Sequence, residues 1–198
     1  MDQASILKNT PQEVKDLLKD YSLPEITGDI RHWGGYIHLK KANEYDEKIL
    51  WINPTGDPSH PIKALSLQYH GIDGIAPHRE VFTAMTDMVL LIGSGDLSKL
   101  SGEQLVEALT EQVNSIQVVF LKRSSTYEIP GGFLHAYVNP FYDRPVILIE
   151  KRISPRDQSA DIREANIYRL FDQDGRGTRG LYPEEIMRKI GKAKEAGR

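Results

Sequence analysis

Three histidines and one glutamate stand where they could share one metal ion. His70 closes an alternating run, and His78 and Glu80 open another, on which alternate residues face the same way. His135 follows a Pro-Gly-Gly turn that can send its imidazole inward. Imidazole and carboxylate groups suit Mn, Fe, Co, Ni or Zn without choosing among them. We expect these four residues to hold one divalent ion, with positions left open for substrate oxygens.

Short strands must position these residues. Runs that alternate, or that are continuously apolar, predict strands of a sheet. They cover residues 37–39, 48–52, 63–70, 78–84, 88–92, 117–121, 135–139 and 146–151. The four candidate ligands therefore come from three separate strands. The alternative is that each histidine is accommodated separately, in the core or on the surface.

Helical periodicity predicts three helices beside those strands. The first begins near Thr10 and ends near Tyr21, the second lies within 101–116, and the third covers 183–194. The first helix carries an apolar stripe that includes Val14. Such a stripe packs against the rest of the fold or, alternatively, forms a dimer contact.

Four residues around the last histidine form a known pattern. Pro130, Gly132, His135 and Asn139 have the spacing Pro-x-Gly-x-x-His-x-x-x-Asn. This pattern resembles the second motif of the cupin family, in which the histidine is a ligand to a divalent metal inside a small antiparallel barrel. The resemblance implies an all-β fold with helical additions, namely a cupin (double-stranded β-helix, jelly-roll) barrel.

The first cupin motif is matched less closely. In the family, two histidines one residue apart are followed by a glutamate three or four residues later. Here a loop at 71–77 separates His70 from His78, and only Arg79 lies between His78 and Glu80. His70 is consequently the least secure ligand, and a site with three protein ligands is an alternative to one with four.

The cupin resemblance also implies three parts of the chain. Residues 1–30 would form an N-terminal helical arm, and residues 31–155 would form the barrel. A helical insertion at about 96–115 would lie outside the barrel or over its mouth. Residues 156–198 would form a C-terminal helical extension.

Further segments narrow the resemblance. The stretches 33–36, 65–70, 78–80 and 167–176 look like, in this order, segments of the cupin domain of type II mannose-6-phosphate isomerases. That family ends in an Ile-x-Arg-x-x-Asp-x-x-Gly-Arg signature. The signature residues here are Ile167, Arg169, Asp172, Gly175 and Arg176.

This likeness implies a metal-dependent aldose–ketose isomerase that acts through an enediolate on a sugar or sugar phosphate, such as mannose 6-phosphate, lyxose or mannose. The metal would stabilise the enediolate charge, and a base would carry the proton. The implied catalytic residues are Glu80, Lys122 and Tyr137, and the implied substrate-binding residues are Gln68, Arg79, Asn139 and Arg169. The alternatives are another metal-dependent cupin enzyme, a lyase or a dioxygenase, and a non-catalytic sugar-binding or regulatory cupin.

The composition of the 198 residues limits partners and compartment. A formal net charge of −3 argues against a nucleic-acid binder, which usually carries an excess of Lys and Arg. Without cysteine, disulfides and thiolate metal sites are excluded. No apolar run approaches a membrane span, and the N-terminus lacks signal-peptide features, so we expect a cytoplasmic protein without membrane partners. Because cupin barrels often pair through edge strands, we expect a homodimer.

The tail contains a second metal-binding pattern. Residues 172–185 resemble an EF-hand calcium loop, with two departures from the ligand pattern. Arg176 occupies the fifth position, where an oxygen ligand is needed, and Pro183 occupies the twelfth, where a glutamate belongs. The alternative is a helix, a turn and a second helix without calcium.

Overall fold

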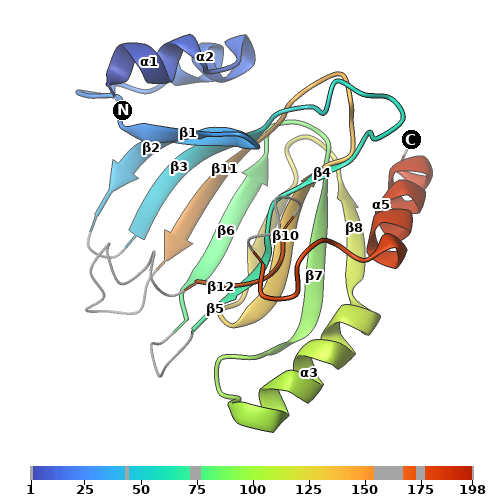
Figure 1. Cartoon of the computed structure of the whole chain (residues 1–198). Coiled ribbons are helices and arrows are strands. Elements are labelled where there is room, and N and C mark those ends of the chain that lie inside the picture. Colours follow the sequence, from blue (N-terminus) through green and yellow to red (C-terminus); the bar gives the residue numbers. More distant parts are fainter. Residues whose placement is uncertain (1, 43–44, 72–76, 154–166, 173–176, 198) are drawn as a thin grey trace.

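Strands assemble into two antiparallel sheets that face each other (Figure 1). The structure, a computed structural model, describes residues 2–42, 45–71, 77–153, 167–172 and 177–197. The first sheet has the order β1 (Gly28–Arg31), β2 (Gly34–Lys41), β3 (Tyr45–Ile52), β11 (Val146–Ile153), β6 (Arg79–Ala84) and β9 (Thr126–Ile129). The second has the order β12 (Ile167–Phe171), β5 (Leu67–His70), β10 (Phe133–Asn139), β7 (Met88–Asp96) and β8 (Gln117–Leu121), with β4 (Lys63–Ala64) beside β10.

The inward faces of both sheets share an apolar core. On β6, Glu80, Phe82 and Ala84 are all buried, as the predicted alternation requires. Phe82 belongs to one apolar cluster with Leu90 of β7 and Leu148 of β11. Each side chain of this size contributes roughly 1.5–3 kcal/mol when it is fully buried. Strand alternation thus places an apolar core and a charged residue on the same inward face.

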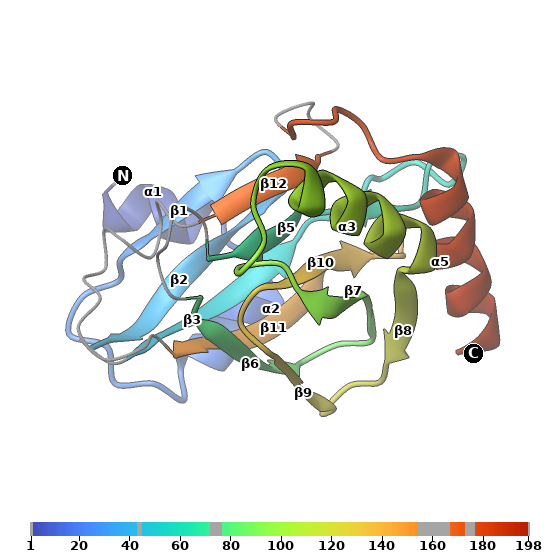
Figure 2. The same ribbon diagram turned by 90° about the horizontal axis from the view of Figure 1, so that it is seen from below.

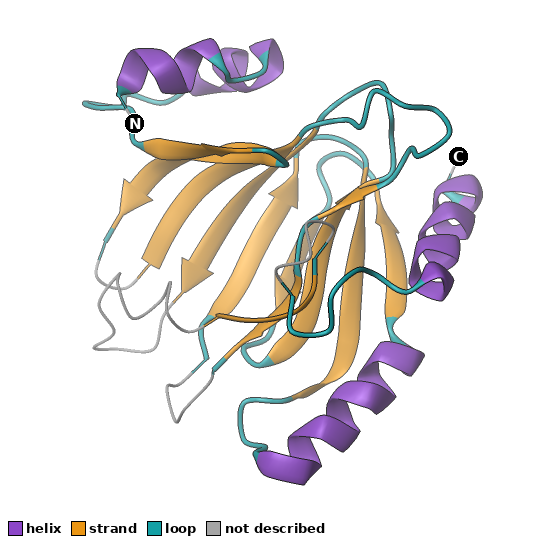
Figure 3. Cartoon of the chain, in the orientation of Figure 1, coloured by secondary structure: helices purple, strands orange, loops and turns teal. Residues whose placement is uncertain are grey.

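Two short helices cover the outer face of the first sheet (Figure 3). They are α1 (Gln3–Lys8) and α2 (Gln12–Leu18). The buried Val14 of α2 packs in one cluster with Trp51 and Ile147, which lie on the outward faces of β3 and β11. The apolar stripe predicted for this segment therefore packs on the barrel.

Two longer helices cover the outer face of the second sheet (Figure 2). They are α3 (Gly102–Ser115) and α5 (Glu184–Ala196). Leu109 of α3 and Ile190 of α5 belong to one apolar cluster with Leu134 of β10. In the described ranges, no helix has the length and apolar character needed to cross a membrane.

The termini differ from the expected helices. The helix predicted from Thr10 to Tyr21 corresponds to α2, which begins directly after Pro11 at its N-cap, and α1 precedes it as a separate helix. The Thr10 hydroxyl donates to the carbonyl of Ile6 at 2.8 Å and ends α1. In the expected C-terminal helical extension, Ile167–Phe171 instead form β12, which pairs with β5. Its aromatic and β-branched residues favour a strand.

Candidate metal centre

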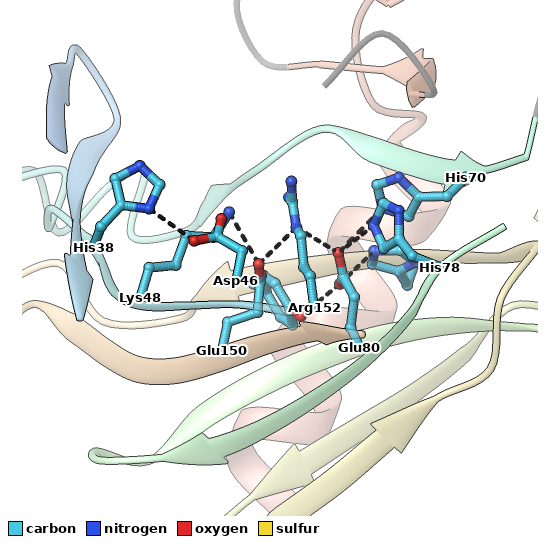
Figure 4. Close-up of polar contacts among 10 residues, drawn as sticks. His38, Asp46, Lys48, His70, His78, Glu80, Glu150 and Arg152 are labelled. Carbon is cyan, nitrogen blue, oxygen red and sulfur yellow. Dashed lines mark hydrogen bonds and ion pairs between the residues drawn. The ribbon is translucent and has the colours of Figure 1, made fainter. Parts of the chain in front are cut away.

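The two sheets bring the four predicted ligands to one point of the interior. His70 ends β5 and His135 lies on β10, which are neighbours in the second sheet. Glu80 lies on β6 of the first sheet, and His78 directly precedes that strand. All four side chains are buried. Figure 4 shows the imidazoles of His70 and His78 turned toward the Glu80 carboxylate.

The Glu80 carboxylate is the centre of this group. Nε2 of His70 lies 3.1 Å and Nε2 of His78 lies 3.4 Å from Oε1 of Glu80. Nε2 of His135 lies 3.1 Å from Oε2. The ligand atoms of His70, Glu80 and His135 all lie within 4.8 Å of one another, a spread that one ion can bridge. His70, the least secure ligand by sequence, is therefore part of the tightest trio, with His78 beside it.

These contacts leave imidazole nitrogens without hydrogen bonds. Within the described chain, neither ring nitrogen of His70 or His78 has a hydrogen-bond partner, and nor does Nε2 of His135. Nδ1 of His135 lies 2.9 Å from the carbonyl of Phe133, which can only accept, so the neutral ring presents a lone pair at Nε2. An unsatisfied buried group costs about 1–3 kcal/mol. Lone pairs that face a carboxylate need a cation between them, and a divalent ion fits these residues.

Burial and charge set different pKa values in the group. Burial lowers the pKa of His70 well below its usual value and lowers that of His78, because a charged imidazole loses its hydration there. Burial also opposes a charged His135, but the Glu80 charge outweighs it and raises this pKa. For Glu80, burial would raise the pKa, but the charges of His135 and Arg152 hold it well below its usual value. His70 and His78 are therefore neutral, as metal ligands must be.

A second layer of contacts orients the Glu80 carboxylate. Nε of Arg152 donates to Oε1 at 3.1 Å, because β11 places Arg152 directly opposite Glu80. The Tyr137 hydroxyl donates to Oε2 at 2.8 Å. Burial and the Glu80 charge raise the pKa of Tyr137 well above its usual value, so the hydroxyl keeps its hydrogen. Contacts of this kind fix the direction of a carboxylate ligand.

A buried row of charges continues from Arg152 (Figure 4). Oε1 of Glu150 lies 2.8 Å from Nε of Arg152 and 3.0 Å from Nζ of Lys48, which stands opposite Glu150 on β3. None of these three residues was predicted to belong to the site: Lys48 and Glu150 lie within the predicted strands 48–52 and 146–151, and the second of these strands stopped one residue before Arg152. Continued alternation from Leu148 through Glu150 to Arg152 was the signal that could have indicated the two residues of β11.

A pocket opens beside the metal centre, and His135 and Tyr137 form part of its wall. The predicted substrate-binding residues Gln68 and Arg169, which face each other across β5 and β12, also line it. The rings of Trp33 and Tyr36 add aromatic surface. The charged residues of its lining are Arg31, Lys48, Glu150, Arg152 and Arg169. Among the described lining residues, cations therefore outnumber carboxylates.

Two residues that the sequence suggested for the site lie on the surface instead. Arg79 is exposed, and its guanidinium pairs with Glu128 of β9 at 2.8 Å. Since Glu80 faces inward, its neighbour on the strand must face outward. Lys122 is also exposed, and its ammonium donates to the carbonyl of Gly197, directly after α5.

Asn139 is buried but serves the backbone rather than a substrate. Its amide nitrogen donates to the carbonyls of Ile52 at 3.0 Å and Arg144 at 2.9 Å. Its amide oxygen accepts from the backbone N–H of Phe141 at 2.8 Å. This side chain is not among the residues that line the pocket. The polar residue at the end of β10 thus fixes the loop that follows it.

The calcium-loop pattern falls partly outside the described residues, which omit 173–176. Asp172, its first position, is buried and accepts a hydrogen bond from the Ser66 hydroxyl at 2.5 Å. Nearby, the Tyr182 hydroxyl donates to the carbonyl of Leu65. Both contacts tie the tail to the segment before β5. Calcium binding at 172–185 stays a prediction.

Comparisons with known proteins concern the fold. No protein-family model and no curated protein matches the chain. A structure of CapF with the inhibitor 3-isopropenyl-tropolone is 12% identical, with a TM-score of 0.49 over 83% of this chain and 43% of that one. A protein with a double-stranded beta-helix domain from Klebsiella pneumoniae is 12% identical, with a TM-score of 0.43 over 69% and 86%. An RmlC-like cupin from Shewanella frigidimarina is 15% identical, with a TM-score of 0.42 over 69% and 92%.

Two antiparallel sheets face each other and enclose a polar site between them. The fold is a cupin barrel. The chain spans less than half the length of CapF, and identities this low say nothing about a shared reaction. The comparisons do not show the narrower likeness to type II mannose-6-phosphate isomerases, which stays a prediction. The cupin barrel offers a buried nitrogen and oxygen ligand set beside a polar pocket, an arrangement that can polarise a substrate oxygen.

Proposed function

We propose that this cupin barrel is a metal-dependent aldose–ketose isomerase acting on a sugar or sugar phosphate. The observation that carries the proposal is the convergence of three buried imidazoles on the Glu80 carboxylate beside a polar pocket. His70, Glu80 and His135 would hold the ion, with His78 next to them. When bound, the ion would supply Lewis-acid stabilisation of the negative charge that develops when a proton next to a carbonyl is removed.

The pocket supports a polyhydroxylated substrate. The Gln68 amide can donate to and accept from hydroxyl groups, and the rings of Trp33 and Tyr36 offer surface for the carbon face of a sugar. The arginines in the wall suit a phosphate group, which they can bind with two parallel hydrogen bonds. These features favour a sugar phosphate over an unsubstituted sugar.

The test begins with the metal. Purified protein would be stripped with a chelator, reconstituted with Mn, Fe, Co, Ni or Zn, and incubated with mannose, lyxose and mannose 6-phosphate. We expect ketose to form with at least one metal, and His135→Ala to abolish it. His60→Ala is the matched control, because His60 is exposed and pairs only locally with Asp57.

Other outcomes would overturn the proposal. Metal-dependent oxygen consumption without ketose would assign a dioxygenase, and bond cleavage without isomerisation would assign a lyase. Sugar binding without any turnover would assign a non-catalytic sugar-binding cupin. Each of these results contradicts the isomerase.

A further inference from the structure

Glu150 is a buried carboxylate in the pocket with one oxygen left over. Its side chain is 1% exposed, and it lines the pocket together with Tyr137 and Lys48. Oε1 lies in ion pairs with Lys48 and Arg152. The Nε–H of Arg152 donates to Glu80, and its contact with Oε1 of Glu150 is an ion pair. In the described chain, neither oxygen of Glu150 has a hydrogen-bond partner, and both ion-pair contacts are made by Oε1.

The carboxylate of the metal centre lacks such a free oxygen. Oε1 of Glu80 accepts from Arg152, and Oε2 accepts from Tyr137, while imidazole nitrogens approach both atoms. A carboxylate held in this way is suited to binding an ion and poorly suited to carrying protons. Glu80, the base implied by the sequence, is thus occupied. Glu80 does not line the pocket, and among the lining residues that the structure describes Glu150 supplies the one carboxylate.

Strand register explains why Glu150 is held so firmly. β11 is paired on both sides, and it places Glu150 opposite Lys48 on β3 and opposite Phe82 on β6. Both cations contact the same oxygen, Oε1, which fixes the carboxylate and leaves Oε2 for another partner. A base that is fixed beside its substrate avoids the entropy of finding the correct geometry.

We propose that Glu150 is the catalytic base that moves the proton between the two carbons of the substrate, an inference that rests on the proposed isomerase activity. Oε2 takes the hydrogen from the hydroxyl-bearing carbon next to the carbonyl, and the C–H electron pair forms the carbon–carbon double bond of the enediolate. Glu150 then returns the proton to the former carbonyl carbon. The hydroxyl proton passes from one oxygen to the other, so substrate and product are isomers and no oxidant is needed.

The competing explanation is a purely structural counter-ion. Lys48 is 4% exposed, and a cation buried so deeply needs a negative partner. Replacing Glu150 alone would then leave Lys48 unmatched and could disturb the fold without any role in proton transfer. The test must therefore separate loss of the base from loss of the ion pair.

The experiment uses full-length protein reconstituted with Mn²⁺ or Co²⁺ and the sugar that the unmodified protein converts. Ketose formation and incorporation of deuterium from D₂O next to the carbonyl would be measured for Glu150→Gln. General bases contribute about 10²–10⁴-fold. We expect both rates to fall by about that factor, while calorimetric Mn²⁺ or Co²⁺ affinity changes by less than about threefold. Glu128→Gln, which removes a carboxylate from a surface arginine pair, should leave both rates unchanged.

A double variant separates the two explanations. Lys48→Met combined with Glu150→Gln removes both charges of the pair and leaves neither buried charge unmatched. If Glu150 is the base, the double variant binds Co²⁺ and stays as inactive as Glu150→Gln. Recovery of turnover in the double variant would show that the residue is a counter-ion and would overturn the inference.

The remaining outcomes distinguish the inference from the proposed function. An active unmodified protein together with an active Glu150→Gln variant, above about a tenth of the original rate, overturns the inference alone. Loss of Co²⁺ binding in Glu150→Gln that returns with activity in the double variant overturns it as well. If the unmodified protein neither forms ketose nor incorporates deuterium with any tested sugar, the proposed function fails and the inference fails with it.

Discussion

At the scale of single residues, the centre of the site is one carboxylate with partners from three other strands and from the residue before its own strand. Glu80 meets Tyr137 of β10, Arg152 of β11 and the histidines that surround them. Every one of these groups is buried, so none can turn to water when its partner is removed. Deleting one partner therefore leaves another polar group unsatisfied, which costs more than the lost contact alone.

Tyr137→Phe should lower the free energy of unfolding by about 1–3 kcal/mol, because it leaves Oε2 of Glu80 without its hydroxyl donor. It should also weaken metal binding by about 10–100-fold, the usual effect of losing a contact that orients a ligand. Urea unfolding and calorimetric metal titration would measure the two effects. Tyr142→Phe is the control, because Tyr142 is 40% exposed and should change neither quantity. Equal effects in both variants would contradict the prediction.

The raised pKa of His135 predicts an alkaline loss of stability in the metal-free protein. A group with a raised folded pKa stabilises fully below its unfolded value of about 6.5, and this contribution is lost as the pH rises through the folded value. His70 and His78, with lowered pKa values, act in the opposite direction and reduce stability as the pH falls below about 6.5. The free energy of unfolding should therefore be greatest near that pH.

Urea unfolding between pH 5 and pH 9 in the presence of a chelator would check this profile. His135→Gln should remove the alkaline decline, and His60→Gln, at an exposed position, should not. A bound metal should also remove the decline, since the ion replaces the proton beside Glu80. An alkaline decline that persists unchanged in His135→Gln would contradict the assignment to this residue.

At the scale of elements, the barrel separates the site from the helices. The clusters that hold α3 and α5 lie on the outer face of the second sheet, while the candidate ligands face the interior. Stability and metal binding should consequently respond to different substitutions. The outer apolar clusters stabilise the sheets, and the side chains on the inner faces form the candidate metal centre.

Ile190→Ala in α5 should lower the free energy of unfolding by about 2–5 kcal/mol, because the side chain is fully buried against the sheet. Metal affinity should stay unchanged. Val106→Ala in α3 is the matched control, because Val106 is 56% exposed and its loss should cost no more than about 0.5 kcal/mol. Urea unfolding and metal titration of both variants would measure this separation. A large loss of metal affinity in Ile190→Ala would show that α5 supports the site directly.

Period-two alternation predicted the inward residues that lie on one strand. It placed His78 with Glu80 and His135 with Tyr137, and the structure confirms that each pair faces inward. Alternation also implied that Arg79 must face outward, a consequence that the substrate-binding assignment overlooked. Within one strand, period-two alternation was therefore sufficient to predict which side chains face inward.

Contacts between strands could not be predicted from the sequence. The approach of Lys48 to Glu150 and of Arg152 to Glu80 depends on which strands pair and in which register, and those partners are far apart in the chain. Asn139 shows the same limit, since its backbone partners Ile52 and Arg144 lie on another strand and in a loop. The helical insertion and the barrel, by contrast, followed from periodicity and from the cupin motif.

At the scale of the whole molecule, the pocket joins distant parts of the chain. Arg31 comes from β1 and Arg169 from β12, yet both line the same pocket. The expected homodimer stays a prediction, which analytical ultracentrifugation of the purified protein would test. Because β1 and β12 both contribute to its wall, substitutions in either strand should affect the pocket.

Arg169→Gln should raise the KM for a phosphorylated sugar by about 10–150-fold, the loss of one charged hydrogen bond of about 1.5–3 kcal/mol. The KM for the unphosphorylated sugar should change by less than about threefold. Steady-state kinetics with mannose 6-phosphate and mannose would measure the difference. Arg79→Gln is the control, since its guanidinium pairs with Glu128 on the surface. Equal changes for both sugars would contradict a phosphate contact at Arg169.

β11 sits between β3 and β6 and carries Glu150 and Arg152 on the same side of its pleat. Removing one amino acid of this strand before Glu150 would turn the residues that follow to the opposite side of the pleat, so Lys151 and Ile153 would take the places of the acid and the guanidinium. The strand can accept many substitutions, but it cannot accept a change of its register by one residue. Among related sequences, the spacing of these two charges should tolerate no insertion or deletion, even where the residues themselves vary.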